Sequence, residues 1–318
     1  MQTVLVAGGA GFIGKHLCES LLKDNYAVIC VDNFITSDKK NLKDLFSNPN
    51  FKFVEHNICE QLDINSLPEI NFVFHLASPA SPNQKSPRSY INFPIETLLA
   101  NSIGTKNLLD LAKKKSAKFL YVSSSEIYGD PLVSPQTENY YGNVSPNGVR
   151  SVYDEGKRFG EAISMAYFRK HKLDVRIIRI FNTYGPSMQV DDGRVVSNFI
   201  NQAIKNEPLT VYGKGEQTRS FCYVDDMVKG LKLAMFAGGT NGEVFNLGNP
   251  DEKTILQLAQ LIKKLTNSRS QIVFENLPQD DPRSRNPNIS KAKRVLDWTP
   301  EVKTEDGILK TIEYFKSL

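Results

Sequence analysis

The chain has 318 residues, of which 40% are hydrophobic and 23% are charged, and this composition is ordinary for a globular protein. Its net charge of +4 is spread along the chain without a dense basic block, so we do not expect nucleic acid as the main partner. We expect neither a secretion signal nor a membrane span, because no apolar run comes near the length of about 18 residues that a span needs, and we expect a cytoplasmic protein.

Strand and helix patterns alternate through the first half of the chain. Short apolar runs typical of buried strands are followed by segments in which apolar residues recur at helical spacing. This alternation predicts an α/β fold of the Rossmann type, a doubly wound parallel sheet with helices on both faces. The expected strands are 3–7, 27–31, 51–55, 72–76, 119–122 and 175–180, and the expected helices are 12–23, 98–112 and 153–171.

A glycine-rich turn follows the first expected strand and opens the first expected helix. Gly8 permits the tight turn, Gly11 lets the backbone approach a pyrophosphate, and Gly14 lets the helix pack on the strand. The N–H groups at the start of the helix, around Phe12 and Ile13, would bind the phosphates. We therefore predict that this turn binds a dinucleotide.

An acidic residue ends the second expected strand. A carboxylate at Asp32 can accept hydrogen bonds from an adenosine ribose and would repel a 2′-phosphate, which favours NAD over NADP. Asn57 and Ile58 follow the third expected strand, where an adenine ring would lie.

Two polar groups are candidates for catalysis. Tyr153 and Lys157 are four residues apart in an expected helix and therefore share one face. We expect the lysine cation and bound NAD+ to lower the pKa of the phenol, so that Tyr153 becomes a base near neutral pH. The run 123–126 follows a strand and should lie at the same edge, where the hydroxyl of Ser124 can bind the substrate oxygen that loses its proton.

The second half of the chain is less regular and is interrupted by glycine and proline residues at 185–186, 213–215 and 248–250. We expect a dinucleotide-binding domain at 1–180 plus about 222–245. A smaller α/β lobe at about 181–221 and 246–318 should bind the substrate and cap the carboxyl edge of the sheet, where ligands of open α/β sheets bind. The four cysteines show no CxxC pair and no metal-ligand spacing with histidine, so we expect reduced thiols and no metal site.

Together with several longer runs, these residues resemble the extended short-chain dehydrogenase/reductase family of sugar-nucleotide enzymes. Within it the likeness is to the UDP-glucuronate decarboxylases, also called UDP-xylose synthases. The resemblance extends from Val4 to about Trp298. The runs that carry it are 75–82, 153–158, 179–186, 192–199, 209–213, 217–221 and 246–250.

The resemblance implies a carboxy-lyase with a redox-neutral cycle. NAD+ would take a hydride from C4 of the glucuronate ring while Tyr153 takes the hydroxyl proton. The resulting 4-keto sugar is a β-keto acid, which loses CO2 because the ketone accepts the electrons as an enolate. Protonation at C5 and return of the hydride would give UDP-xylose.

Three positions separate the sister reactions of this family. Related 4,6-dehydratases place an Asp immediately before such a Glu, whereas this chain has Ser125 before Glu126. Related 4-epimerases usually lack the Glu. Decarboxylases also carry an Arg in a loop that matches 280–285, where Arg285 is the positional match and would orient the carboxylate and assist protonation at C5.

Motif position also implies which residues bind the ligands. Asn182 should hold the UDP phosphates, Arg219 and Arg194 should add charge-assisted contacts, and Tyr212 should meet the uracil. The substrate-binding candidates are Ser124, Glu126, Tyr153, Asn182, Asn198, Thr210, Tyr212, Gln217, Arg219 and Arg285. The further NAD-binding candidates are Asn33, Phe34, Thr36, Leu76, Ala77, Ser78, Asn101, Tyr153, Lys157, Thr183 and Arg194.

The chain departs from the family pattern near the substrate. The segment 83–93 is several residues longer than the pattern, and Leu99-Ala100 stands where decarboxylases commonly have Lys-Thr. We hypothesise that Lys85 or Arg88 of the longer segment replaces the lost cation. Ser187 also stands where Arg is usual, and Asn57 where Asp is usual.

Other functions remain open at this point. The alternative enzyme is a 4-epimerase or 4,6-dehydratase that acts on another UDP- or dTDP-sugar. A catalytically silent NAD-binding protein is disfavoured, because the chain retains the whole set Ser124, Glu126, Tyr153, Lys157 and Arg285. The resemblance further implies a homodimer joined by a four-helix bundle, to which each subunit would contribute helices 98–112 and 153–171.

Overall fold

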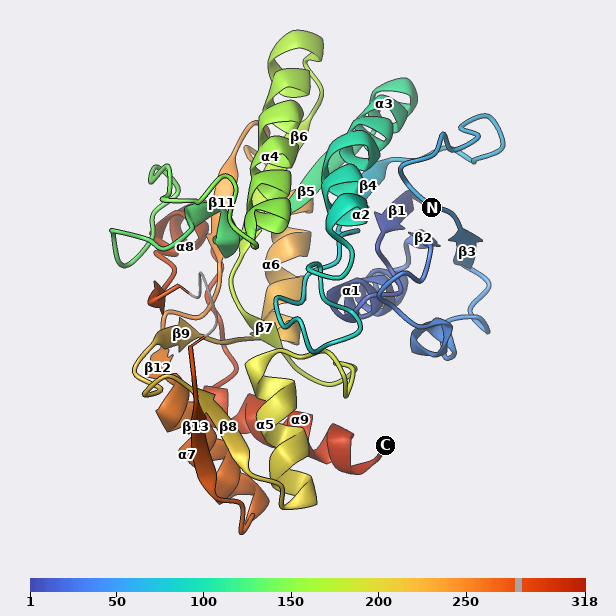
Figure 1. Cartoon of the computed structure of the whole chain (residues 1–318). Helices are drawn as coiled ribbons and strands as arrows, with labels where there is room; N and C mark the ends of the chain where they lie inside the picture. The colour runs from blue at the N-terminus through green and yellow to red at the C-terminus, as the bar shows by residue number, and fades with distance from the viewer. Residues whose placement is uncertain (278–281) are drawn as a thin grey trace.

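The computed structural model describes residues 1–277 and 282–318. Its largest element is a seven-stranded sheet in the order β11-β6-β5-β4-β1-β2-β3, and every pair of neighbouring strands is parallel (Figure 1). This is the Rossmann order with one further strand beside the sixth, and it confirms the predicted fold class. The strands are β1 (Thr3–Ala7), β2 (Ala27–Asp32), β3 (Phe51–Glu55), β4 (Phe72–His75), β5 (Lys118–Ser124), β6 (Val175–Ile180) and β11 (Val244–Leu247).

Helices cover both faces of the sheet because its strands are apolar on both sides. In β1, Val4 and Val6 belong to the buried cluster that includes α1 and α6, whereas Leu5 and Ala7 belong to the cluster that includes α3. Figure 1 shows α2, α3 and α4 together on one side of the sheet. The covering helices are α1 (Phe12–Lys23), α2 (Pro94–Leu99), α3 (Thr105–Lys115), α4 (Ser151–His171) and α6 (Val224–Phe236).

The expected helix 98–112 is longer than predicted and contains an irregular turn. α2 runs through a π-helical turn at Ala100–Gly104 into α3. Within this turn, Asn101 Nδ2 donates to Ser78 Oγ at 2.8 Å, and Tyr121 Oη donates to Asn101 Oδ1 at 2.9 Å. Turns of this kind are frequent at functional sites, and here the turn fastens the helix to the carboxyl edge of the sheet.

Most of the remaining elements form a smaller lobe beyond that edge, in the lower part of Figure 1, whereas α8 (Ser290–Leu296) packs beside β11. Parallel β8 and β13 form one ribbon, β9 pairs with β12 and β14, and β7 pairs with β10. The lobe and its connections comprise β7 (Thr183–Tyr184), α5 (Val195–Lys205), β8 (Leu209–Tyr212), β9 (Thr218–Ser220), β10 (Cys222–Tyr223), β12 (Glu252–Thr254), α7 (Ile255–Thr266), β13 (Ile272–Glu275), β14 (Ser284–Arg285) and α9 (Thr304–Lys316).

The hydrophobic core is continuous between the sheet and the lobe. Leu258 and Trp298 belong to the same buried cluster as Val4 and Val6. The segment 222–245 was expected to belong to the dinucleotide-binding domain, and β11 extends two residues beyond it, to Leu247. The division into two domains stays a prediction. None of the helices in the described ranges has both the length and the apolar composition needed to cross a membrane.

Candidate functional site

A cavity of about 1000 Å³ lies at the carboxyl edge of the sheet, and the lobe contributes to its wall. Such a volume is at the upper end for small-molecule sites. The structure brings most of the predicted site residues to its wall. They are Gly8, Gly11, Phe12, Ile13, Gly14, Thr36, Leu76, Ser78, Ser124, Ser125, Glu126, Tyr153, Lys157, Asn182, Thr183, Arg194, Asn198, Thr210, Tyr212, Gln217 and Arg219.

The glycine turn after β1 is closely packed, as a dinucleotide cradle requires. Gly8 has φ of +83°, and a Cβ on it would lie 2.6 Å from Ala77 N. A Cβ on Gly14 would lie 2.1 Å from the Gly8 carbonyl oxygen. α1 begins at Phe12 with Gly11 as its N-cap, so its first N–H groups lie at the cavity wall without a capping side chain from the described residues. This geometry fits a pyrophosphate.

Asp32 ends β2, and its carboxylate is hydrogen-bonded to the backbone of the glycine turn. Its Oδ2 accepts a hydrogen bond from Ala10 N at 3.0 Å, and its Oδ1 accepts from Ser37 Oγ at 2.7 Å and from Phe34 N at 3.0 Å. Burial raises the pKa of Asp32, although these hydrogen bonds act in the opposite direction. Asp32 thus has an observed structural role, and its contact with a ribose stays a prediction.

Other predicted cofactor residues pack beside the cavity. A Cβ on Gly104 would lie 2.6 Å from Ile58 Cδ1, so Ile58 fills the space under the π-helical turn. Asn57 Oδ1 accepts from Cys59 N at 3.1 Å. Among the described residues, the predicted members that lie outside the cavity wall are Asp32, Asn33, Phe34, Asn57, Ile58, Ala77, Asn101 and Arg285.

Tyr153 and Lys157 share one face of α4 at the cavity wall. Lys157 Nζ lies 5.7 Å from the centre of the Tyr153 ring and donates to the Val122 carbonyl at 2.9 Å. Burial lowers the pKa of Lys157 to about 7. Burial also raises the pKa of Tyr153 to about 12, against a hydrogen bond with Ser124 that lowers it. In the protein alone the pKa of Tyr153 is thus raised, because the phenolate loses its solvation on burial, and the expectation that Lys157 and bound NAD+ together lower it stays a prediction.

Glu126 lies between two arginines. It follows β5 in the 3₁₀ turn Ser125–Tyr128. Arg150 Nη2 donates to Glu126 Oε2 at 2.5 Å, while Arg285 donates through Nη2 to Oε2 at 3.2 Å and through Nε to Oε1 at 3.3 Å. Burial alone would raise the pKa of Glu126, but Arg285 and Arg150 together hold it well below its usual range. Glu126 is thus an anion throughout the neutral range.

Arg285 lies in a short strand and is almost completely buried. β14 pairs with β9 so that Arg285 is in register with Arg219. The side chain of Arg285 is 1% exposed, and the residue reaches Glu126 from outside the cavity wall. Asp280 and Asp281, which belong to the loop predicted to carry this arginine, lie outside the described residues.

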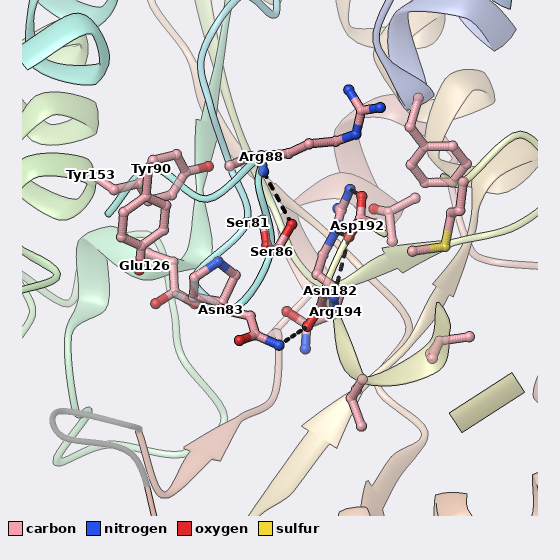
Figure 2. Close-up of a pocket in the computed structure, with 18 of the residues that line it drawn as sticks. Ser81, Asn83, Ser86, Arg88, Tyr90, Glu126, Tyr153, Asn182, Asp192 and Arg194 are labelled. Atoms are coloured by element: carbon pink, nitrogen blue, oxygen red, sulfur yellow. Dashed lines mark hydrogen bonds and ion pairs between the residues drawn. The ribbon is translucent and has the colours of Figure 1, made fainter. Parts of the chain in front are cut away.

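Two residues of the site were missed by the sequence reasoning. Arg150 lies three residues before Tyr153, and that spacing is the signal that could have placed it on the same side of the helix. The ring of Tyr90 stacks on Tyr153, with 5.0 Å between ring centres and 7° between ring planes (Figure 2). No local pattern marks Tyr90, because a long loop brings it to the site.

The two cations of the longer loop are already paired. Lys85 Nζ lies 3.6 Å from a carboxylate oxygen of Glu275, and Arg88 Nε donates to Asp191 Oδ1 at 2.9 Å. Both residues line the cavity, but each one neutralises an acid of the lobe. The structure therefore does not support the hypothesis that either cation replaces the lysine missing at Leu99.

Comparisons with known proteins agree with this geometry. Residues 4–248 match the model of the NAD dependent epimerase/dehydratase family. UDP-glucuronic acid decarboxylase 1 of Xenopus tropicalis is 49% identical over 315 residues, which are 99% of this chain and 72% of that protein. UDP-glucuronic acid decarboxylase 3 of Arabidopsis thaliana is 50% identical over 307 residues, which are 96% of this chain and 86% of that protein.

Solved structures of related enzymes have the same fold. UDP-glucuronic acid 4-epimerase from Bacillus cereus, in complex with UDP-glucuronic acid and NAD, has a TM-score of 0.89 and 29% identity, with 99% of both chains covered. The chain belongs to the NAD dependent epimerase/dehydratase family. Its relatives at about 50% identity within that family are UDP-glucuronic acid decarboxylases, which confirms the resemblance seen in the sequence.

Replacing Arg150 by methionine tests the electrostatic environment of Glu126. We expect Arg150→Met to raise the pKa of Glu126, because the buried carboxylate loses one of its two cations. We also expect the free energy of unfolding at pH 7 to fall by about 1.5–3 kcal/mol, the range for a hydrogen bond to a charged group. Titration of the labelled glutamate carboxyl by ¹³C NMR and chemical denaturation measure the two effects.

The sign of the pH dependence follows from the lowered pKa of Glu126. The ionised pair stabilises the native state above the unfolded glutamate pKa of about 4.3, and this stabilisation is lost as the pH falls toward the native pKa. Arg158→Met is the matched control, since Arg158 lies on the same helix but donates to the carbonyls of Ile127 and Tyr141. An unchanged Glu126 titration in Arg150→Met would contradict the two-arginine assignment.

Proposed function

We propose that this chain catalyses the NAD-dependent decarboxylation of UDP-glucuronate to UDP-xylose through a UDP-4-keto sugar. The observation that carries the proposal is the cluster of Glu126, Arg150 and Arg285, which adjoins Tyr153 and Lys157 at a cavity that also contains the glycine turn. Identity of about 50% to UDP-glucuronic acid decarboxylases over nearly the whole chain supports it.

The cofactor would lie along the glycine turn. The backbone between Gly8 and Gly14 would hold the pyrophosphate, Thr36 would lie at the adenosine end, and Thr183 at the nicotinamide end. When bound, NAD accepts a hydride from C4 of the sugar and later returns it. The side chains of the protein supply position, charge and proton transfer.

Tyr153 is proposed to take the proton of the sugar 4-hydroxyl. Burial keeps the phenol protonated in the protein alone, and the charge of an oxidised dinucleotide adds to that of Lys157 to favour phenolate. Ser124 would hold the same oxygen, because its hydroxyl already hydrogen-bonds with Tyr153. Lys157 has a pKa of about 7 and so loses its own charge as the pH rises above neutrality.

The cluster around Glu126 suits a substrate that carries a carboxylate. Burial raises the pKa of Asp154 to about 8, so this neighbouring acid is mostly neutral at pH 7. The guanidinium groups of Arg150 and Arg285 both donate to Glu126, and their N–H groups would orient the sugar carboxylate beside this cluster. As the C5–C6 bond breaks and CO2 leaves, the electron pair of that bond passes to the C4 ketone as an enolate. C5 then takes up a proton, and the arginine pair would orient the group that delivers it.

The runner-up activity is 4-epimerisation or 4,6-dehydration of another UDP- or dTDP-sugar. The similar Bacillus cereus enzyme is a UDP-glucuronic acid 4-epimerase, so the fold alone does not select the reaction. A dehydratase needs an acid to expel the C6 hydroxyl, and the position before Glu126 is the hydroxyl residue Ser125. The arginine pair around Glu126 favours decarboxylation over both alternatives.

Product analysis tests the proposed reaction. The protein incubated with UDP-glucuronate and NAD+ should release CO2 and form UDP-xylose, read by mass spectrometry. Tyr153→Phe should lower kcat by about 10²- to 10⁴-fold, the usual contribution of a general base, with little change in substrate affinity. Tyr141→Phe is the matched control because that ring is 88% exposed, and it should keep full activity. A product of unchanged mass, formed by inversion at C4, would contradict the proposal.

We further propose that the chain forms a homodimer through α2, the π-helical turn and α4. Ile95, Ile103 and Phe159 are large apolar side chains on these elements, and they are 60%, 45% and 48% exposed. α2 packs against α4, so two copies of this surface would form a four-helix bundle with an apolar centre. The four cysteines are free thiols, which supports the proposal of a cytoplasmic location.

A charge placed in that surface tests the dimer. Phe159→Glu should convert the dimer to a monomer in analytical ultracentrifugation, because a carboxylate would be buried without a partner. Leu309→Glu is the control, since Leu309 is 39% exposed on α9 and lies away from the proposed bundle. Monomeric wild-type protein at micromolar concentration would rule out this assembly.

A further inference from the structure

Two segments far apart in the sequence meet across the cavity. Residues 81–92 belong to the connection between β4 and α2, and residues 189–194 belong to the segment that precedes α5 in the lobe. Figure 2 shows Ser86 on the first segment facing the second, where Asp192 lies. The two segments approach closely at Gly193, since a Cβ on this residue would lie 2.7 Å from Ser86 Cβ. Gly193 also has φ of +83°, which favours glycine. We call these two segments the clasp.

Three side chains of the first segment bind the second. Asn83 Nδ2 donates to the Gly193 carbonyl at 3.1 Å, and Ser86 Oγ donates to the Asp191 carbonyl at 2.5 Å. Arg88 Nε donates to Asp191 Oδ1 at 2.9 Å, and this is the charged contact among the three. The side chain of Arg88 is 23% exposed, so its ion pair is less screened than a fully exposed one.

Arg88 also reaches the part of the sheet where the adenosine would lie. Its Nη1 donates to the Thr36 carbonyl at 2.9 Å, and Thr36 lines the cavity just after the turn that Asp32 organises. A single guanidinium therefore joins the loop after β2 to Asp191 of the lobe. The Lys85–Glu275 pair runs in the same direction, but both of its side chains are highly exposed and it contributes little.

The other end of the clasp lies over the glycine turn. The guanidinium of Arg194 is 5.7 Å from the centre of the Phe12 ring, at the first residue of α1. Asp192 holds this guanidinium, accepting from Nε at 2.5 Å and from Nη2 at 2.7 Å. The clasp thus extends from the adenosine end of the expected cofactor site to its pyrophosphate end.

We propose that the clasp retains the dinucleotide through the whole catalytic cycle, with Arg88 as the positioning residue that joins the two sides of the cavity. This inference rests on the proposed function, because NAD is the ligand retained. A reaction that removes a hydride and returns it to the same sugar fails if the reduced cofactor leaves between the two steps. A contact between the lobe and the sheet lengthens the residence time of the bound dinucleotide, since this contact must break before the cofactor can leave.

The dissociation rate of NADH tests the clasp without any sugar present. Protein loaded with NADH is mixed with an excess of NAD+, and the loss of bound-nicotinamide fluorescence is followed. Arg88→Gln and Asp191→Asn should each release NADH about three- to tenfold faster than the wild type, as expected when a partly exposed charged contact is lost. The double variant should be no faster than Arg88→Gln alone, because that change already breaks the contact.

The control removes an ion pair of the same kind elsewhere. Lys229→Gln breaks the exposed pair between Lys229 of α6 and Glu301, neither of which lines the cavity, and should leave NADH release unchanged. Asp191→Asn is conservative at a half-exposed site, so it should fold even if Arg88→Gln does not. The proposal would be overturned if both clasp variants released NADH at the wild-type rate. It would also be overturned if Lys229→Gln accelerated NADH release as much as they do.

A second readout follows the sugar. Clasp variants should release more UDP-4-keto sugar per UDP-xylose formed than the wild type. Once NADH has left, the 4-keto intermediate cannot be reduced to UDP-xylose. An unchanged ratio despite faster NADH release would overturn the catalytic role of the clasp. The proposed function is tested by a different measurement, the release of CO2 from UDP-glucuronate by the wild type. A failure of the clasp proposal can therefore be told apart from a failure of the proposed function.

Discussion

The parallel pairing of all seven strands puts their carboxyl ends at one edge, and the polar groups of the site depend on that arrangement. The glycine turn follows β1, Ser124 ends β5, and Asn182 comes just after β6. α4 then brings Tyr153 to the same edge, beside β5. Residues more than a hundred positions apart thus line one cavity because the sheet has a single direction.

Burial sets the chemistry of the groups at this edge. Lys157 with a pKa near 7, a tyrosine whose pKa is raised, and a glutamate held ionised by Arg150 and Arg285 all lie within a short distance of one another. Buried charges are costly unless they are paired, and here each one has partners from different elements. The arginine contacts to Glu126 join the 3₁₀ turn after β5, the N-cap of α4 and β14. The same interactions therefore connect the lobe to the sheet and set the charge of the site.

The sequence was most informative where structure is local. Apolar periodicity predicted the strands and the helices on both faces, and the spacing of Tyr153 and Lys157 predicted their shared helix face. Glycines Gly8, Gly11 and Gly14 identified the cradle because their steric role depends on neighbours in the same turn. These features are fixed by a few consecutive residues and need no knowledge of the rest of the fold.

The features that were missed depend on long-range packing. Tyr90 and the first segment of the clasp belong to a loop whose path is set by contacts with residues 63 to 105 positions away. Burial raises the pKa of Tyr153 in the protein alone, and a helix pattern does not reveal that burial. Arg285 was expected in a loop, but it lies in a short strand that pairs with β9, and its side chain is 1% exposed.

The central claim is that one enclosed site removes a hydride from the sugar and returns the same hydride to it. UDP-glucuronate labelled with deuterium at C4, turned over in an excess of unlabelled NADH and NAD+, tests this claim directly. We expect UDP-xylose that keeps the deuterium at C4, because the reduced cofactor stays bound between the two transfers. Product in which the label has exchanged with the unlabelled pool would contradict a single enclosed cycle.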